Sequence, residues 1–316
     1  MRSFTTTDRS DLPVLREPHG TARAVQAIVS APQSLEGGGF TVFRPFPQPG
    51  AQLADTDPFL MLDEMGPADY APGEAVGAPD HPHRGFETVT YLLDGEFVHR
   101  DSTGGGGLLR GGDTQWMTAG AGLVHSEMPT ERIMRDGGRV HGLQLWVNLP
   151  RAAKMTPPRY QDLTADTLTY LATADGCGVV RLIAGDLDGH SGPGSTHTPI
   201  VYAHVSLDAG GRFAVAWPDV CNALVYVLDG AVRVGGDTRA VRAHQLAVLS
   251  REGDDIVIDA DTDAECIVIG GRPFREPIAW YGPFVMNTKQ EILDAIDDFQ
   301  AGRLGAIPPE QDRSSL

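Results

Sequence analysis

The sequence predicts an all-β fold in which two β-barrel domains are followed by a short C-terminal helix. Glycine and proline are frequent, with 38 and 23 residues. Long helical periodicity is scarce, which favours many short strands joined by tight turns. At 316 residues the chain exceeds the usual size of one domain, so two domains are expected. The apolar fraction of 41% is enough for folded cores and excludes a disordered chain.

A strand-and-turn pattern occurs twice along the chain. Residues 224–230 (LVYVLDG) repeat the form of residues 89–95 (VTYLLDG), and residues 243–249 echo residues 112–117. The first alignment shifts the numbering by 224 − 89 = 135. We interpret this repetition as a duplicated β-barrel.

The first elements follow from local pattern. Residues 1–20 carry little pattern and are predicted to form a loose tail. Residues 23–30 and 39–46 alternate as strands do, and the apolar run 57–63 is expected to be a further strand. Residues 66–80, rich in proline and glycine, are predicted to be a loop that either borders a ligand pocket or is an ordinary surface connection.

Two pairs of polar residues stand out in the first repeat. His81 and His83 form one pair, and His125 and Glu127 form the other, at the same two-residue spacing. In a strand, residues two apart share a face and lie about 6.6 Å apart along the backbone. Each pair is therefore expected to point its two side chains in one direction.

The segment between these pairs is expected to bring them together. Strand-like runs at 87–100 and 108–118 are joined by a glycine turn at 104–107. A single His-x-His pair is usually an ordinary surface feature, but a second pair after one hairpin's length favours a metal site. Three imidazoles and one carboxylate suit iron, manganese, nickel, copper or zinc.

The other histidines and the second repeat are predicted to lack metal. His99 and His141 have no partner at metal spacing, so we expect them to be surface groups or groups that support the site. In the second repeat, the shift of 135 places Ala216, Pro218 and Asn222 opposite His81, His83 and Glu87. The second barrel is therefore predicted to be a scaffold.

Charge and cysteine content exclude several classes of protein. The net charge of −17 disfavours direct binding to nucleic acid or to an anionic membrane surface. Cys177, Cys221 and Cys266 are too few and too scattered for a disulfide framework. No signal-peptide pattern or membrane-spanning run occurs, so we predict a cytoplasmic protein.

The C-terminal region is predicted to be helical. Beyond Asn287, apolar residues recur with a period of about 3.6 residues. Thr288 is expected to cap the helix with Glu291 in capping-box position, and Gly302 is expected to end it. The predicted divisions of the chain are a metal-binding domain at 21–155, a domain without metal ligands at 156–287, and the helix and tail at 288–316.

Several motifs together resemble one protein family. They are HPHRGFETVTYLLDGE at 81–96, QWMTAG at 115–120, HSEMP at 125–129, DPFL at 57–60, GLQLWVNLP at 142–150 and GPFVMNT at 282–288. This set resembles the pirin family of the cupin superfamily, over residues 20–310 and more densely in the first half. The resemblance implies a bicupin, with two cupin-type β-barrels in one chain.

The resemblance also implies an assignment of ligands. In pirins the carboxylate two residues after the third histidine binds the metal, which implies His81, His83, His125 and Glu127 as ligands here. Across the wider superfamily the glutamate after the His-x-His pair is often the ligand. Glu87 is therefore the rival, as a ligand or as a group that orients a histidine.

The activity implied by the resemblance is that of a quercetin 2,3-dioxygenase, which cleaves a flavonol with O2 and releases carbon monoxide. We expect one divalent metal ion, Fe(II), with Mn, Ni, Cu and Zn as alternatives. Glu127 would be the catalytic general base as well as a ligand. The alternative is a non-enzymatic iron or redox sensor that acts through a regulatory protein partner, for which the acidic surface would suit a basic protein.

Overall fold

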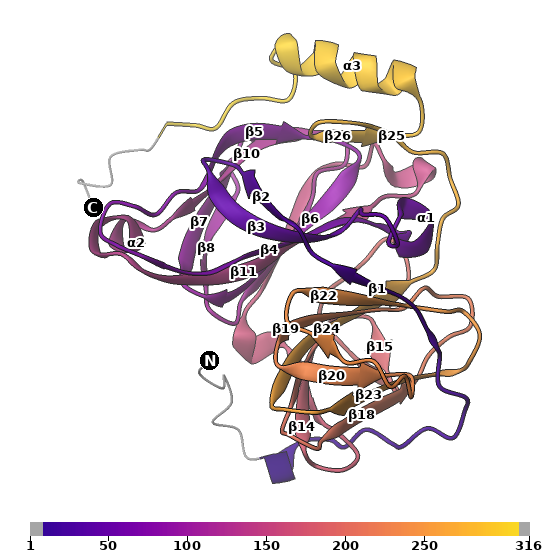
Figure 1. Ribbon diagram of the computed structural model, residues 1–316. Coiled ribbons are helices and arrows are strands. Elements are labelled where there is room, and N and C mark those ends of the chain that lie inside the picture. Colours follow the sequence, from indigo (N-terminus) through magenta and orange to yellow (C-terminus); the bar gives the residue numbers. More distant parts are fainter. Residues whose placement is uncertain (1–8, 310–316) are drawn as a thin grey trace.

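The computed structural model describes residues 9–309, and most of these lie in antiparallel strands that form two barrels (Figure 1). The predicted all-β class, with two barrels and a short C-terminal helix, is confirmed. Each barrel combines a seven-stranded sheet with a four-stranded sheet.

The first barrel carries the two polar pairs. Its seven-stranded sheet has the spatial order β12 (Arg159–Leu163), β9 (Thr114–Thr118), β6 (Phe86–Asp94), β11 (Gly138–Asn148), β4 (Phe59–Tyr70), β3 (Phe40–Phe46) and β2 (Gln33–Glu36). Its four-stranded sheet has the order β5 (Ala78–His83), β10 (Leu123–Pro129), β7 (Glu96–Asp101) and β8 (Gly106–Arg110).

The second barrel repeats this arrangement. Its seven-stranded sheet has the order β1 (Val25–Ser30), β22 (Gln245–Leu249), β19 (Leu224–Asp229), β24 (Ala264–Gly271), β17 (Ile200–Leu207), β14 (Gly178–Ala184) and β13 (Thr169–Ala172). Its four-stranded sheet has the order β18 (Arg212–Ala216), β23 (Asp255–Ala260), β20 (Ala231–Val234) and β21 (Val241–Arg242).

Short elements complete the fold. Two small hairpins pair β15 (Asp186–Leu187) with β16 (His190–Ser191) and β25 (Ala279–Tyr281) with β26 (Phe284–Met286). The α-helices are α1 (Leu53–Thr56), α2 (Glu131–Asp136) and α3 (Lys289–Gln300), and Arg9–Asp11, Arg151–Ala153 and Ala165–Thr167 form single 3-10 turns. Across residues 9–309, no helix is both long enough and apolar enough to cross a membrane.

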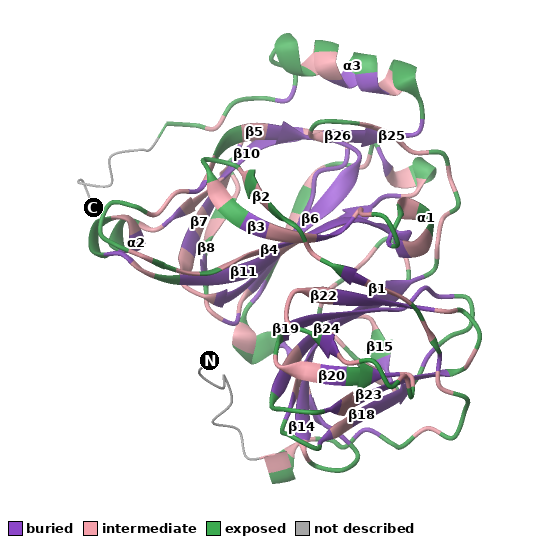
Figure 2. Cartoon of the chain, viewed as in Figure 1, coloured by how far each residue is buried: buried purple, intermediate pink, exposed green. Residues whose placement is uncertain are grey.

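The two seven-stranded sheets pack face to face and form a core between the barrels (Figure 2). Successive residues of a strand point to opposite faces. Val89 and Tyr91 of β6 therefore pack against the second sheet, where they share one core with Leu224 and Tyr226 of β19. Thr90, between them, lines the interior of the first barrel.

Two strands cross the predicted domain boundaries. Strand β1, which lies inside the predicted first domain at 21–155, pairs with β22 of the second barrel. Strand β12, which lies inside the predicted second domain, pairs with β9 of the first barrel. Each of the two predicted domains therefore contributes one strand to the sheet of the other barrel. The domain boundaries themselves stay a prediction.

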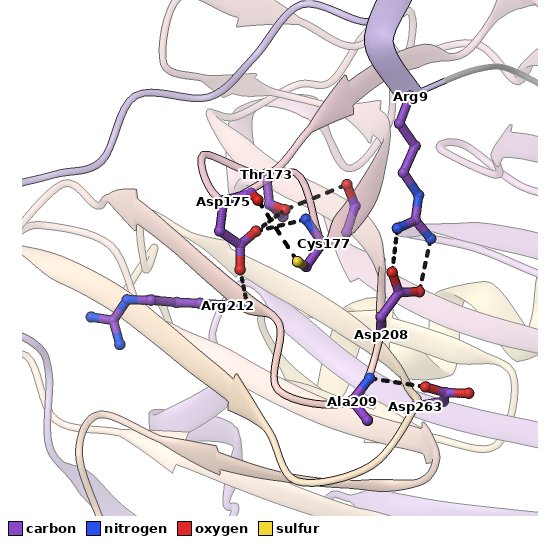
Figure 3. Close-up of polar contacts among 9 residues, drawn as sticks. Arg9, Thr173, Asp175, Cys177, Asp208, Ala209, Arg212 and Asp263 are labelled. Atoms are coloured by element: carbon purple, nitrogen blue, oxygen red, sulfur yellow. Dashed lines mark hydrogen bonds and ion pairs between the residues drawn. The ribbon is translucent and has the colours of Figure 1, made fainter.

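The predicted loose tail is wrong for its second half, whereas residues 1–8 lie outside the described residues. Leu15 is 1% exposed in the core of the second barrel, and its backbone N–H donates to the carbonyl oxygen of Ala172 at 2.9 Å. Arg9 forms an ion pair with Asp208 through both guanidinium ends (Figure 3). The sequence shows no periodicity there because the segment follows the barrel as an extended chain.

The predicted C-terminal helix and its cap are confirmed. The Thr288 hydroxyl accepts from the backbone N–H of Glu291 at 3.2 Å, and the Glu291 carboxylate accepts from the N–H of Thr288 at 2.8 Å. Helix α3 ends at Gln300, two residues before Gly302. It lies beside β25 and β26, on the outside of the first barrel (Figure 1).

The segments predicted as strands around the polar pairs are strands, but each predicted run is divided into two shorter strands. The run 87–100 is divided into β6 and β7 at Gly95, and the run 108–118 is divided into β8 and β9. The predicted loop 66–80 is partly strand, because β4 continues to Tyr70 and β5 begins at Ala78. Strand β5 carries the first polar pair into the barrel.

Candidate metal centre

Three histidines gather where β5 pairs with β10. In this ladder His81 is opposite His125, and His83 is opposite Leu123. The ring centroids of His81 and His83 lie 4.3 Å and 4.8 Å from that of His125, and 4.7 Å from each other. One ligand atom from each histidine lies within 4.8 Å of the others. Small side-chain adjustments would bring all three to the metal–nitrogen distance of about 2.1 Å.

The turn that follows the first pair requires a glycine. Gly85 has φ of 89°, and a Cβ atom there would lie 2.0 Å from the carbonyl oxygen of Val285. Lys154 Nζ donates to the carbonyl oxygens of Gly85 and Val285 and to Asn148 Oδ1, each at 2.8 Å. Burial lowers the pKa of Lys154 to about 8. The turn after His83 is therefore held against β26 by one buried ammonium.

Two of the histidines use Nδ1 for a hydrogen bond to the backbone. His81 Nδ1 lies 2.7 Å from the carbonyl oxygen of Pro79, and His83 Nδ1 lies 3.4 Å from that of Pro283. A carbonyl oxygen only accepts, so each Nδ1 must carry the proton. The lone pair of each ring is then on Nε2, which is the form that binds a metal.

The third histidine has a different partner. His125 Nδ1 lies 2.8 Å from Nε2 of His99 on β7. His125 Nε2 is buried and has no hydrogen-bond partner in the described part of the chain. A buried nitrogen without a partner, beside two further imidazoles, fits the donor set of a metal site. His99, predicted to be a surface or supporting group, is 2% exposed and supports the site.

The protonation of the buried rings also fits metal binding. Burial, and then the neighbouring His81, hold the pKa of His83 well below its usual range. Burial, and then the neighbouring His83, have the same effect on the pKa of His125. Both imidazoles are therefore neutral at neutral pH, and neutral imidazole is the form that donates a lone pair to a cation.

Glu127 lies in the same cavity but outside the histidine cluster. Its carboxylate accepts from the Thr90 hydroxyl at 2.6 Å and from Gln144 Nε2 at 2.9 Å. The register between β10 and β5 shifts after His125, so that Glu127 is opposite Ala78. This irregularity turns the carboxylate toward the cavity wall, where two neutral side chains hold it.

Glu87 lies on the other face of β6, together with Val89. Its carboxylate accepts from the Thr118 hydroxyl at 2.6 Å and lies 3.9 Å from His197 Nε2. Burial raises the pKa of Glu87 to about 7. The turn at Gly85 separates β5 from β6, so Glu87 and His83 lie on different strands.

A cavity of about 570 Å³ lies in front of the cluster. Its wall combines apolar side chains with a few polar ones. The apolar part includes Phe40, Met61, Met65, Phe97, Trp146 and Trp280. Trp146 and Trp280 face each other with ring centroids 5.7 Å apart. Trp280 comes from the segment after the second barrel, so distant parts of the chain build one pocket.

An ion pair lies on the cavity wall. Arg44 donates through Nε and Nη2 to both oxygens of Asp63, at 2.6 Å each, and Nη2 also contacts Glu36 at 2.7 Å. Burial raises the pKa of Asp63, and Arg44 opposes this shift. The arginine is therefore engaged by two carboxylates before any ligand enters.

The sequence did not predict the pocket residues that surround the cluster. Gln144 and Trp146 lie two apart on β11, so strand periodicity places them on one face. The spacing inside the motif at 142–150 therefore indicates that these two side chains point to the same side of the sheet. Trp280 had no such signal, since only the tertiary fold brings β25 to the first barrel.

Known proteins resemble the chain in both halves. A model of the family described as Pirin matches residues 39–147, and one described as Pirin C-terminal cupin domain matches residues 202–305. A Pseudomonas aeruginosa protein with the provisional name quercetin 2,3-dioxygenase is 45% identical over 78% of this chain and 86% of its own length. A pirin-like protein of Caulobacter vibrioides is 44% identical over 89% of this chain and 99% of its own.

A solved structure shows the same fold along almost the whole chain. The quercetin 2,3-dioxygenase of Acinetobacter baumannii superposes with a TM-score of 0.86 at 39% identity, and the match covers 91% of this chain and 100% of that one. Identity of this level over both halves extends beyond a shared fold. The two barrels, the two matching family models and these relatives lead to one conclusion: the chain belongs to the pirin family of bicupin proteins.

Proposed function

We propose that this protein binds one divalent metal ion at His81, His83 and His125, with Glu127 as fourth ligand. The observation that carries this proposal is the convergence of three imidazoles, among which His125 Nε2 is buried and has no hydrogen-bond partner within residues 9–309. We expect Fe(II), with Mn, Ni, Cu and Zn as alternatives. Glu127 would reach the metal by leaving the hydrogen bonds that it makes to Thr90 and Gln144.

We propose further that the protein is a dioxygenase of the quercetin 2,3-dioxygenase type. Iron held by four protein ligands would supply open positions for a flavonol oxygen and for dioxygen. Glu127 would accept the proton of the flavonol hydroxyl as general base. Both atoms of O2 enter the ring-opened ester product, and one ring carbon leaves as carbon monoxide. The relatives with quercetin 2,3-dioxygenase names support this reaction.

The cavity wall supports an uncharged aromatic substrate. Trp146 and Trp280 both line the cavity, with ring centroids 5.7 Å apart and ring planes inclined at 35°, so the wall offers aromatic contact area to a planar ring system. The lining contains four carboxylates but a single arginine, which Asp63 and Glu36 already engage. Even with a divalent cation bound, the cavity keeps a negative balance. Small dianions such as oxalate are therefore disfavoured, and a neutral polyphenol is favoured.

The experiment that tests this function starts from protein purified without added metals. We expect about one metal ion per chain, and oxygen uptake with quercetin but not with oxalate. His83→Ala should abolish both metal binding and oxygen uptake. His190→Ala, on β16 of the second barrel, is the control and should change neither. Wild-type protein that binds no metal, or a His83→Ala variant that keeps it, would overturn the metal centre.

The alternative function is regulation through a protein partner. The net charge of −17 suits a basic partner. A metal-loaded protein that consumes no oxygen with any flavonoid of a panel, but binds a protein partner only in one oxidation state, would favour the sensor over the enzyme.

A further inference from the structure

The three cluster histidines differ in what holds them. His81 and His83 each form a hydrogen bond through Nδ1 with a backbone carbonyl oxygen, which can only accept. Their rings are therefore fixed with the proton on Nδ1 and the lone pair on Nε2. His125 Nδ1 forms a hydrogen bond with His99 Nε2, a ring nitrogen that can either accept or donate. Of the three cluster histidines, only His125 therefore has a partner that is compatible with either tautomer.

The pair His125–His99 has two arrangements with the same number of protons. In the first, His125 Nδ1–H donates to His99 Nε2, so His125 Nε2 keeps its lone pair. In the second, His99 Nε2–H donates to His125 Nδ1, so His125 Nε2 carries a proton and cannot bind a metal. Both outer nitrogens, His125 Nε2 and His99 Nδ1, are buried without a partner in the described part of the chain. Outside the pair, the Tyr160 hydroxyl lies 3.4 Å from His99 Nε2, and a hydroxyl can donate to this nitrogen or accept from it, so this contact is compatible with either arrangement.

The surroundings of His99 keep its ring in place. The ring of Tyr160, from β12, lies 4.9 Å from that of His99, and the Tyr160 hydroxyl lies 3.4 Å from His99 Nε2. Asp101, two residues further along β7, is opposite His125 in the ladder with β10. Contact with an aromatic ring and burial at 2% exposure leave the His99 ring little freedom to turn away from His125.

We propose that His99 is a positioning residue that holds His125 in its metal-binding tautomer by accepting a hydrogen bond from Nδ1. This inference rests on the proposed metal centre. Binding of a cation at His125 Nε2 selects the first arrangement. One proton of the pair is then on His125 Nδ1, between the two rings, and the other is on His99 Nδ1. The cluster thus has two histidines fixed by the backbone and one fixed by a side chain that mutation can change.

The test uses Zn(II) as the probe and the full-length protein. Nitrogen-15 NMR of the imidazoles should show His125 protonated at Nδ1 and His99 unprotonated at Nε2 in the zinc-loaded wild type. His99→Leu removes the acceptor, so the affinity for Zn(II), measured by chelator competition, should fall about 10–100-fold. His99→Gln places an amide oxygen at similar reach and should restore the affinity to within about threefold.

The control variant is His141→Leu, which removes an equally buried histidine at a site away from the cluster. It should leave the Zn(II) affinity unchanged. Equal affinity in wild type and His99→Leu, or zinc-loaded protein with His99 protonated at Nε2, would overturn the role of His99 while leaving the metal centre intact. Zinc-loaded protein with His125 protonated at Nε2 would instead remove His125 from the proposed ligands. Failure of the wild type itself to bind Zn(II) at the cluster would overturn the proposed metal centre as well. The NMR measurement on wild type decides the question even if His99→Leu fails to fold.

Discussion

The two barrels share one strand arrangement but differ in what fills them. In the first, the ladder of β5 and β10 sets His81 opposite His125. In the second, the corresponding ladder of β18 and β23 sets Val215 opposite Ile256. Both of these apolar residues are at most 1% exposed and belong to the core of the second barrel. The same strand arrangement thus supports a cavity with a histidine cluster in one copy and a packed apolar core in the other.

The second barrel carries a buried arginine. Arg23 is fully buried and donates to the carbonyl oxygens of Cys221 and Pro218 at 2.8 Å, and of Gly253 at 3.2 Å. Pro218 is the residue that the repeat aligns with His83. A fixed side-chain cation therefore binds the backbone of the segment that the repeat aligns with the first histidine pair. The strand arrangement of a barrel and the side chains that fill it can therefore differ independently.

The largest expected effect comes from making the first barrel resemble the second. His81→Val replaces a histidine of β5 with an apolar residue, the type that predominates in the corresponding ladder of the second barrel. We expect metal affinity and oxygen uptake to fall at least about 100-fold, since one of the ligands is lost. The free energy of unfolding of the metal-free protein should change by less than about 1 kcal/mol, because His81 is only partly buried. Metal analysis and chemical denaturation check both; full metal retention would contradict the ligand assignment.

The reverse change tests whether the second barrel is a scaffold. Arg23→Met removes the donor to one buried and two partly buried carbonyl oxygens, so the free energy of unfolding should fall by about 2–3 kcal/mol. Metal content should stay at the wild-type level. Urea denaturation measures the first quantity and metal analysis the second. A loss of metal in folded Arg23→Met protein would show that the two barrels are coupled.

The seam between the barrels should give a pH-dependent stability. Glu87, with a pKa raised from 4.5 to about 7, stays protonated when folded while the unfolded chain already ionises. Stability should therefore fall as pH rises from about 4.5 to 7, by up to about 3 kcal/mol. Glu87→Gln should remove this dependence and be the more stable form at pH 8. Denaturation curves of both proteins across this range test it; equal slopes would contradict the assignment to Glu87.

The smallest expected effect lies at the C-terminal helix, which covers the first barrel only. Thr288→Ala removes the cap of α3 and should cost about 1 kcal/mol. Asp298 of this helix contacts Arg84, the residue after His83, at 2.8 Å. Metal affinity should still stay within about threefold, because Arg84 also donates to the carbonyl oxygen of Ala121. Thermal unfolding and chelator competition provide the two measurements, and Ser at position 288 is the matched control.

Local pattern accounts for the features that the sequence predicted well. The two-residue spacing of His81 and His83 placed both on one strand face, and the capping box of Thr288 and Glu291 predicted the start of α3. Both depend on residues at most a few positions apart, where backbone geometry alone decides. The duplication was visible as well, because equivalent strands kept equivalent apolar patterns.

By itself, therefore, the sequence determined the fold class, the pirin resemblance and the three histidines that come together. Only the tertiary structure decided the rest: the exchange of β1 and β12, the face on which Glu87 lies, the position of Glu127 beside the cluster, and the contact between His99 and His125. Each of these depends on how strands distant in the chain pair, where one turn or one register shift reverses a side chain. No local pattern encodes such a choice, because its free energy comes from packing across the barrel.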